Sequence, residues 1–461
     1  MDKINKVLLV LNLLLVVTLS GCKTSDYEIL STPISFINLE KEGHIEQLHD
    51  YDSPYTICYK NKDDTYTIYI FSSPVQFKTE KGYNIIDNTV IGSSYQNFVF
   101  ENKANSIKTY FPMTLDDEFL VKDGNNHISF SVNEDVKDFS EAKVKEYINM
   151  YGDKVTAVVY ESSNIDMVFY PTRTGIRVEM VLRKQLNQEI FSYSVKTSGN
   201  IYENKQNGYI LFKNGDKNTS IIYAPLIKGS KNNENNFNIE SQLDISKQED
   251  GYLVNLNIDD NVLNNNKIVH PVYFDLSFEL YLSKIPDTSV YSNFNINSYL
   301  QRYAVIGTHP TFGEGWEYVR FRLNYFIEQS CTKVNSAEYI TKKINHINTR
   351  GNINVSIPNE QWSSSQIIWN TQIDFTESLN YKISENNSLL SINITDFVKE
   401  CIFDNTSLSE SIGIVLSSKL KEKYIVLATA EDSLYSTCLK LHLSDLPYEF
   451  TERTSVNESL F

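Results

Sequence analysis

Short stretches of alternating apolar and polar residues, each followed by a turn-forming cluster, repeat along most of this chain at intervals of about 8–14 residues. The stretch 65–71 (TYTIYIF) is typical, and 207–227 holds two such stretches that reverse at Asn214-Gly215. Tyr, Ile, Val and Thr favour pleated surfaces, whereas Asn favours the turns between strands. The pattern therefore predicts a mainly β protein built from antiparallel sheets.

One segment, 138–154, departs from this alternation. Its apolar residues recur at helical spacing, Asp138 could cap a helix there, and Gly152 could end it. The residues at this spacing are Val144, Tyr147, Ile148 and Tyr151. We therefore expect one helix in the N-terminal domain, packed on a sheet. A short helix is also expected after the strand-like run that begins at Leu389, with Thr395 as its cap.

A polar break near 283–288 divides the chain into two β-rich domains, 35–282 and 285–445, and a polar tail follows at 446–461. The length is sufficient for two domains that each have a core of their own.

The N-terminus has a short positive region and then an apolar run over 7–19. This run is far shorter than the ~20 apolar residues that a membrane-spanning helix needs, and it fits a secretory signal. It ends at Leu19-Ser20-Gly21-Cys22, which resembles a bacterial lipobox. The resemblance implies a signal peptide at 1–21, a lipid on Cys22 and a tether at 22–34. We therefore expect a lipoprotein anchored to the outside of the cell membrane, at a Gram-positive cell surface.

The formal net charge of −16 at pH 7 argues against nucleic acid as a partner. Besides Cys22, the chain has Cys58, Cys331, Cys401 and Cys438. Four cysteines in a chain of this length do not make a disulfide framework. Free core thiols and one bond among the three C-terminal cysteines are the alternatives.

Sequence signatures of catalysis and of transition-metal binding are absent. There is no G-x-S-x-G, no H-E-x-x-H and no P-loop, and the seven histidines form no i,i+2 or i,i+4 pair. We therefore expect no catalytic residue, no cofactor and no metal site. Two alternatives stay open: a carboxylate pair in a cleft, as in glycosidases, and a structural Ca²⁺ in a turn such as 122–126 (KDGNN) or 214–218 (NGDKN).

All three tryptophans lie in the second half of the chain, at Trp316, Trp362 and Trp369. If a strand starts at Trp316, then Tyr318, Arg320 and Arg322 share its face, because alternate residues of a strand point the same way. Indole and phenol rings stack on the apolar faces of sugars, and guanidinium groups donate to their polar substituents. This face, with Trp362, therefore predicts a glycan-binding surface. The alternative is a face that is merely solvated or buried against the first domain. Trp369 is expected in the core.

A series of stretches runs in order through 285–445: 286–292 (PDTSVYS), 303–307 (YAVIG), 318–323 (YVRFRL), 334–341 (VNSAEYIT), 364–370 (SSQIIWN), 392–398 (INITDFV) and 411–416 (SIGIVL). In this order they resemble the DNRLRE domain of bacterial surface proteins, a relative of carbohydrate-binding modules. The resemblance implies a jelly-roll-like antiparallel β-sandwich. Asn324 departs from the family's usual Asp, and no Pro follows Trp369-Asn370.

Three stretches of the first half are also familiar: 74–89 (PVQFKTEKGYNIIDNT), 164–182 (NIDMVFYPTRTGIRVEMVL) and 268–278 (IVHPVYFDLSF). They resemble regions that accompany DNRLRE domains in wall-associated Rhs/YD-repeat proteins of Gram-positive bacteria. The chain is therefore similar to the N-terminal head of such a protein, on a lipid anchor and without YD repeats.

Three function classes follow. The first is a non-catalytic surface lipoprotein that binds polysaccharide or cell-wall glycan through an open Trp316–Arg322 face. The second is a structural or protein-interaction module of a cell-wall or secretion assembly, for which the same face would be covered. The third is a glycan-cleaving enzyme, which would need a pair of carboxylates in a cleft.

Overall fold

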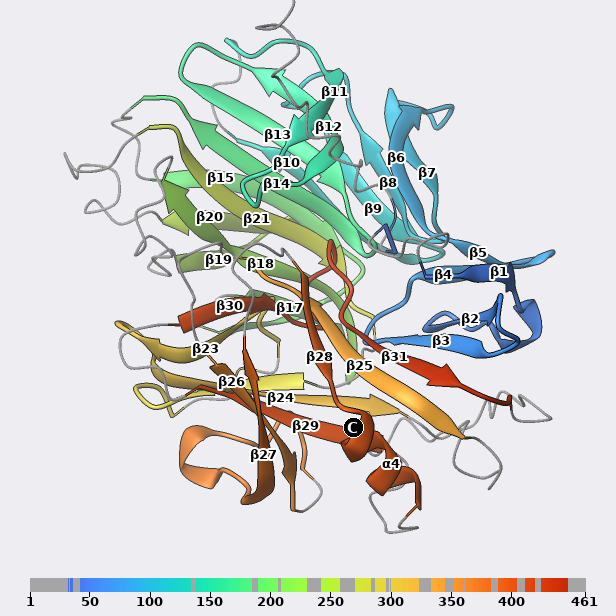
Figure 1. Cartoon of the computed structure of the whole chain (residues 1–461). Coiled ribbons are helices and arrows are strands. Elements are labelled where there is room, and N and C mark those ends of the chain that lie inside the picture. Colours follow the sequence, from blue (N-terminus) through green and yellow to red (C-terminus); the bar gives the residue numbers. More distant parts are fainter. Residues whose placement is uncertain are drawn as a thin grey trace, which may run out of the picture.

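The computed structural model describes residues 32, 34–35, 42–133, 138–184, 190–205, 209–229, 242–257, 270–282, 287–295, 298, 300–322, 333–344, 352–359, 362–382, 389–403, 411–418 and 424–446. Within these residues the protein is mainly β, as predicted, and its strands form two stacked sandwiches (Figure 1). No helix in the described ranges is both long enough and apolar enough to cross a membrane. The expected signal peptide and Cys22 lie outside the described residues.

The first sandwich consists of two eight-stranded antiparallel sheets, here called the outer sheet and the middle sheet. In spatial order, the outer sheet contains β19 (Gln242–Gln248), β20 (Gly251–Asn257), β15 (Ile190–Thr197), β10 (Asn126–Val132), β9 (Phe119–Asp123), β8 (Lys108–Phe111), β7 (Phe100–Ala104) and β6 (Asp87–Gly92). The middle sheet contains β11 (Lys143–Ile148), β12 (Lys154–Glu161), β13 (Ile165–Pro171), β14 (Gly175–Leu182), β21 (Val272–Leu280), β18 (Lys217–Gly229), β17 (Tyr209–Asn214) and β16 (Ile201–Lys205). Rings from both sheets stack in the core between them, as Phe119 does on Phe169.

The second sandwich also has two sheets, here called the facing sheet and the end sheet. The facing sheet contains β27 (Phe375–Lys382), β26 (Asn352–Pro358), β29 (Ser411–Ser417), β24 (Gly313–Arg322), β23 (Tyr303–His309) and β30 (Tyr424–Ala428), with β22 (Asp287–Tyr291) paired to β24. The end sheet contains β1 (His44–Gln47), β2 (Thr56–Asn61), β3 (Tyr66–Phe71), β31 (Cys438–Leu443), β25 (Val334–Lys342) and β28 (Leu389–Asn393). The remaining elements are the hairpin of β4 (Gln76–Thr79) and β5 (Gly82–Ile85), the helix α4 (Thr395–Phe403), and the 3₁₀ turns η1 (His49–Tyr51) and η2 (Trp369–Thr371).

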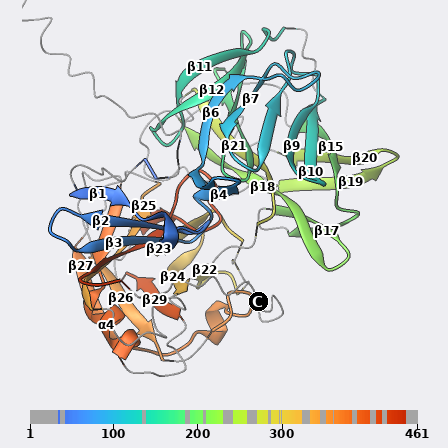
Figure 2. The same cartoon turned by 90° about the vertical axis from the view of Figure 1, so that its right-hand side faces the viewer.

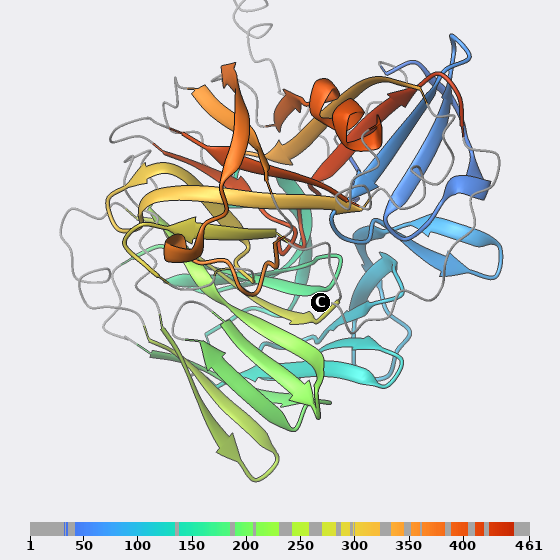
Figure 3. The same cartoon turned by 90° about the horizontal axis from the view of Figure 1, so that it is seen from below.

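The first strands of the chain belong to the second sandwich, although the sequence places them in the N-terminal domain 35–282. Strand β3 pairs with β31 from Tyr66↔Leu443 to Phe71↔Cys438, so β1–β3 extend the end sheet. The blue strands accordingly lie beside the red strand in Figure 1 and Figure 3. The apolar faces of β2 and β3 need a partner sheet, and that partner comes from the far end of the sequence, where local patterns give no sign of it.

The helix expected over 138–154 is wrong, because this segment forms strand β11 and a turn. β11 pairs with β12 along its whole length, from Lys143↔Val159 to Ile148↔Lys154. Val144 and Ile148 are 38% and 48% exposed, so the helical spacing did not mark a buried helix face. Pairing at the sheet edge outweighed the local pattern. The short helix expected at Thr395 is confirmed as α4.

The two sandwiches pack through the middle sheet and the facing sheet. Alternate residues of β12 and β13, such as Val159 and Tyr170, meet alternate residues of β23 and β30, such as Val305 and Val426, in one apolar cluster. Since the other face of the middle sheet packs on the outer sheet, the middle sheet is covered on both sides. This arrangement creates the interface described next.

Candidate functional site at the interface of the two sandwiches

Strand β14 places charged side chains in the middle of this interface. Its alternate residues Ile176, Val178 and Met180 enter the core of the first sandwich. Period-two alternation therefore turns Arg177 and Glu179 toward the second sandwich. Both side chains are fully buried. Buried charges need partners. Arg177 has one in Asp432 of the second sandwich, whereas Glu179 accepts hydrogen bonds from Tyr147 and the Met150 amide of its own sandwich.

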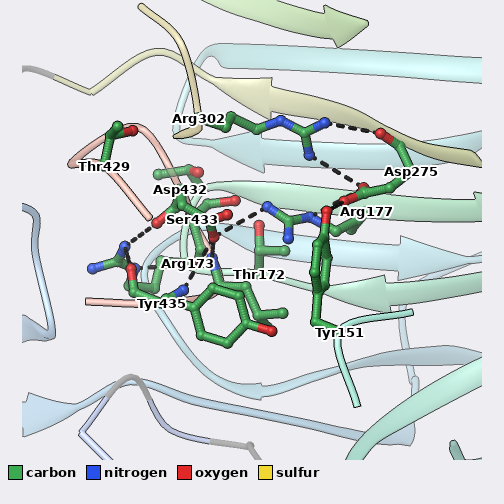
Figure 4. Close-up of polar contacts among 12 residues, drawn as sticks. Tyr151, Thr172, Arg173, Arg177, Asp275, Arg302, Thr429, Asp432, Ser433 and Tyr435 are labelled. Carbon is green, nitrogen blue, oxygen red and sulfur yellow. Dashed lines mark hydrogen bonds and ion pairs between the residues drawn. The ribbon is translucent and has the colours of Figure 1, made fainter. Parts of the chain in front are cut away.

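Arg177 and Arg302 share the carboxylate of Asp275 (Figure 4). Nε of Arg177 is 3.4 Å and an Nη atom of Arg302 is 3.2 Å from the same oxygen, Oδ1. Arg302 also donates to the main-chain oxygen of Asp275 at 2.8 Å. Nη2 of Arg177 donates to Oδ1 of Asp432 at 3.2 Å. Because Arg177 and Asp275 come from the middle sheet whereas Arg302 and Asp432 come from the second sandwich, these pairs join the two sandwiches.

The turn 429–437, between β30 and β31, accepts further hydrogen bonds across the interface. The guanidinium of Arg173 donates to the main-chain oxygens of residues 432, 433 and 435 and to Oγ of Ser436, at 2.5–3.1 Å. Asp432 Oδ1 in turn accepts the amides of Leu434 and Tyr435, at 2.9 and 3.1 Å. One arginine of the first sandwich thus holds the shape of a turn of the second.

Two further carboxylates carry the network outward. Glu279 accepts hydrogen bonds from Thr174 of its own sheet and from Ser433 of the turn, both at 2.6 Å. Asp153 accepts the hydroxyl of Tyr435 and pairs with Lys342 at 2.7 Å. Glu279 therefore has one partner in each sandwich, whereas both partners of Asp153 lie in the second sandwich.

Tyrosines surround the ion pairs and exclude solvent from them. Tyr151 donates to Asp275 and lies 6.0 Å from the guanidinium of Arg177, while Tyr223 lies 5.4 Å from that of Arg302. Burial raises the pKa of Tyr151 well above its ordinary value, and the adjacent Asp275 raises it further. Tyr151 therefore stays protonated and serves as a hydrogen-bond donor.

Burial and neighbouring charges move two carboxyl pKa values in opposite directions. Burial raises the pKa of Glu179 to about 7, against hydrogen bonds from Tyr147 and the Met150 amide that lower it. Burial also opposes ionisation of Asp432, but the guanidinium groups of Arg177 and Arg302 outweigh it and hold its pKa below the ordinary value. The interface is thus organised around a charged Asp432, while Glu179 is neutral below neutral pH.

This network is suited to a structural role. Arg177, Asp275, Arg302 and Asp432 are each no more than 3% exposed. Their charges compensate one another. Nη2 of Arg177 donates to Asp432, whereas its Nε and Nη1 have no hydrogen-bond partner among the described residues. The arrangement can lock two sandwiches together, but it offers a substrate no exposed nucleophile or proton carrier.

The predicted glycan-binding face is covered by the chain itself. Tyr318 and Trp362 are 0% and 7% exposed and pack edge to face, 5.6 Å apart, so the expectation that they stand on an open surface is wrong. The cover is the segment 362–373, which places Trp362 and Ile367 over the strand. Arg320 lies 4.6 Å from the ring of Trp362 and donates to its main-chain oxygen.

Trp316 lies half-buried at the edge of this cluster. Its indole nitrogen donates to Glu314 at 3.0 Å, and its ring packs edge to face on Trp369 and Phe375, each 5.3 Å away. Trp369, expected in the core, is also only half-buried. The side chain of Arg322 lies outside the described residues.

The structure describes the side chains of two of the cysteines and both of the turns that were considered as Ca²⁺ sites. Cys58 and Cys438 are free, buried thiols, whereas Cys331 and the side chain of Cys401 lie outside the described residues. Within the described ranges, no three His, Cys, Asp or Glu side chains gather as metal ligands would. The segments 122–126 and 214–218 are hairpin turns, with Gly124 and Gly215 at positive φ.

The arginine network was missed in the sequence. Arg177 and Glu179 alternate with apolar residues, as the charged residues of a solvated strand face also do. The one available signal was the clustering of Arg173 and Arg177 around the turn at Thr174-Gly175, within a stretch otherwise rich in buried-type residues.

No family model matches the chain. The tRNA nuclease WapA of Bacillus subtilis strain 168 and the tRNA3(Ser)-specific nuclease WapA of Bacillus spizizenii are each 24% identical to it over 229 residues. Each match covers 45% of this chain and 10% of the relative, so the chain spans about a tenth of the length of these proteins. Among solved structures, the N-terminal domain of the Streptococcus gordonii adhesin Sgo0707 aligns over 77% of this chain and 87% of that domain. The TM-score of this alignment is 0.15 and the sequence identity is 10%.

Proposed function

We propose that this protein is a non-catalytic lipoprotein of the cell surface that serves as a structural or protein-interaction module, its two sandwiches acting as one body. The observation that carries the proposal is the buried network of Arg177, Asp275, Arg302 and Asp432. These charges are compensated only while the two sandwiches stay together, and domains that bind ligands independently do not need such an interface. Removing such charges from water is unfavourable unless their partners stay in place.

The covered aromatic face favours this function class over glycan binding through the second sandwich. A ring that stacks on a sugar must expose a face, and Tyr318 and Trp362 are buried. Trp316 packs against both Trp369 and Phe375, and these contacts cover part of its ring. A covered Trp316–Arg322 face is the condition that the structural or interaction role requires.

The position of the first strands supports an anchored body. The tether from Cys22 leads toward β1, which begins at His44 in the end sheet. β1 is the edge strand of this six-stranded sheet and pairs with β2, which is joined through β3 to β31.

The nuclease activity named for the WapA relatives is not part of the proposal. The match covers a tenth of those proteins, and a net charge of −16 opposes approach to a polyanion such as tRNA.

Metabolic labelling with palmitate, followed by detergent phase partitioning, tests the anchor. The wild-type chain should carry label and enter the detergent phase, whereas Cys22→Ala should lose the label. Cys58→Ala is the matched control, because Cys58 is a buried thiol of the body and its loss should leave the label in place. Label that persists in Cys22→Ala would contradict the proposal.

A further inference from the structure

The outer sheet turns one face away from the rest of the molecule. Its inner face packs on the middle sheet, and in Figure 2 the second sandwich lies below the first. Within the described residues, the buried apolar clusters do not extend over the outer face of this sheet. That face is therefore available to a ligand in a way that the interface and the Trp316 cluster are not.

A group of three aromatic rings lies on this face near the edge strand β6. Tyr95 stacks on Tyr110 with ring centres 4.6 Å apart, and Phe98 lies 5.3 Å from Tyr110. Tyr110 is buried beneath the other two, whereas Tyr95 keeps 42% of its surface exposed. A large ring held by two others, yet this open to water, is the side chain that a stacking ligand needs.

The loop that carries Tyr95 is held in one shape. Ser93 donates to Glu101 at 2.8 Å and accepts the amide of Tyr95 at 3.0 Å. The amide of Phe98 returns to the oxygen of Tyr95 at 3.1 Å, and Asn97 takes the left-handed conformation, φ 72°, that closes this turn. The ring is therefore positioned before any ligand arrives, which reduces the entropy lost on binding.

Two ammonium groups without ion pairs lie on the same face as a row of four residues, which includes the apolar Leu120 and the buried Ser129, whose hydroxyl donates to the exposed Glu118 at 2.7 Å. Lys122 lies 5.2 Å from the centre of the Tyr95 ring, and Lys196 is exposed on β15. Within the described residues neither makes an ion pair, whereas Lys103 and Lys108 pair with Asp87 and Glu101. Strand pairing aligns Tyr110 with Leu120, Leu120 with Ser129, and Ser129 with Lys196. At ~4.8 Å between strands, this row extends roughly 14 Å from the rings to Lys196.

We propose that this face binds an anionic saccharide chain, with one sugar stacked on Tyr95 and its acidic groups beside Lys122 and Lys196. The ring supplies an apolar platform, and the ammonium groups supply local positive charge on a protein whose formal net charge is −16. Ser131 and Ser194 lie on the same face beside the row and are partly or fully exposed, so their hydroxyls can meet those of the sugar. The acidic group can be a uronic carboxylate or a phosphate.

A protein partner fits this face less well than a saccharide. Among the described residues near it, Ile91 on the same outer face is the only large exposed apolar side chain apart from Tyr95. Protein interfaces need a larger buried apolar centre. The proposal is independent of the structural role proposed above, since it concerns the opposite side of the first sandwich and makes no use of the lipid anchor.

Binding to three probes tests the proposal, with the full-length chain purified in detergent. The probes are a hyaluronan decasaccharide, which carries carboxylates, a sugar-bearing polyribitol phosphate, and neutral chitohexaose. We expect at least one anionic probe to bind, and its binding to weaken with added salt. Which anionic probe binds identifies the acidic group.

The variants separate stacking from charge. Tyr95→Ala should weaken binding by about tenfold or more, Tyr95→Phe should stay within about twofold, and Lys122→Gln should weaken binding and reduce its salt dependence. Tyr202→Ala is the matched control, because Tyr202 is 38% exposed at the opposite edge of the first sandwich, on β16, and its loss should not affect binding.

Three results would overturn the proposal: no binding of either anionic probe, equal or tighter binding of chitohexaose, or binding that is unchanged in Tyr95→Ala. If Tyr95→Ala does not fold, the salt dependence decides. A Lys122→Gln variant that binds an anionic probe with unchanged affinity and salt dependence would equally overturn it.

Discussion

The two sheets of the first sandwich share a strand pattern in which charged residues alternate with core residues, but the charged residues are buried in one sheet and exposed in the other. In the middle sheet, charged residues alternate with core residues and are buried against the second sandwich, as Arg177 and Glu179 are. In the outer sheet, charged residues at equivalent alternate positions, such as Lys103 and Lys196, stay exposed. Alternation thus determines which side chains share a face, but it does not determine what covers that face.

This difference in burial should appear as a difference in the free energy of unfolding lost when charged residues of the two faces are substituted. An ion pair in water contributes little, because its charges are well solvated when apart. Breaking a buried pair leaves a charge that neither water nor a partner compensates. Substitutions at the interface should therefore destabilise the protein far more than similar substitutions on the open face.

The largest effect is expected for Arg177→Met, which leaves Asp275 and Asp432 without a shared partner. The free energy of unfolding should fall by about 3–5 kcal/mol in a denaturant titration. Arg183→Met is the matched control, since Arg183 forms an ion pair with Asp166 but is 47% exposed. Its loss should remain below about 1 kcal/mol. Equal losses for the two variants would remove the contrast between the faces.

A smaller loss, about 2–3 kcal/mol, is expected for Arg173→Met, because main-chain oxygens of the turn 429–437 lose their donor. Arg173→Lys should lose nearly as much, since an ammonium cannot reproduce the planar fork. Hydrogen exchange at the amides of Leu434 and Tyr435 should also become faster. A stable Arg173→Lys variant with unchanged exchange would show that the fork does not hold the turn.

Stability should depend on pH through Glu179. Its pKa is raised to about 7 in the folded protein, above its unfolded value, so the folded state binds more protons between the two values. Its stabilising contribution is complete below the unfolded pKa and is lost as the pH rises through about 7, at up to ~1.4 kcal/mol per pH unit. The free energy of unfolding, measured at pH 5, 6 and 7, should fall less steeply in Glu179→Gln. Asp432, with a lowered pKa, contributes no slope in this range, because its contribution is lost only in acid.

The smallest effect is expected on the open face. Lys103 pairs with Asp87 at 2.7 Å and is 56% exposed. Lys103→Met should leave the midpoint of a denaturant titration essentially unchanged, because the exposed pair is well solvated when apart. A loss comparable to that of Arg177→Met would mean that the outer face is also part of a buried interface.

Several features of the fold could be predicted because they are local. The predominance of strands, the turn at Asn214-Gly215 and the helix at Thr395 each follow from residues that are close in sequence. The helix expected over 138–154 failed because an edge strand with half-exposed apolar residues can show helical spacing by coincidence. The assignment of 44–71 to the second sandwich could not be predicted, since it depends on pairing with β31, more than three hundred residues away.

The candidate site was not predictable for a related reason. Trp316 and Tyr318 were correctly placed on one strand, but the segment 362–373 that covers them comes from a different part of the sequence. Arg177 and Asp432 become a pair only when the two sandwiches stack. Long-range contacts decide which faces are buried, and a single sequence does not contain them in local form.

Coincidence of unfolding transitions tests most directly whether the two sandwiches act as one body. All three tryptophans lie in the second sandwich, so their fluorescence reports its unfolding, while hydrogen exchange at β9 and β10 reports that of the outer sheet. The buried network predicts that both probes give one common midpoint in guanidinium chloride, and that Arg177→Met lowers it or splits it in two. Two separate midpoints in the wild-type protein would contradict a single body joined by its buried charges.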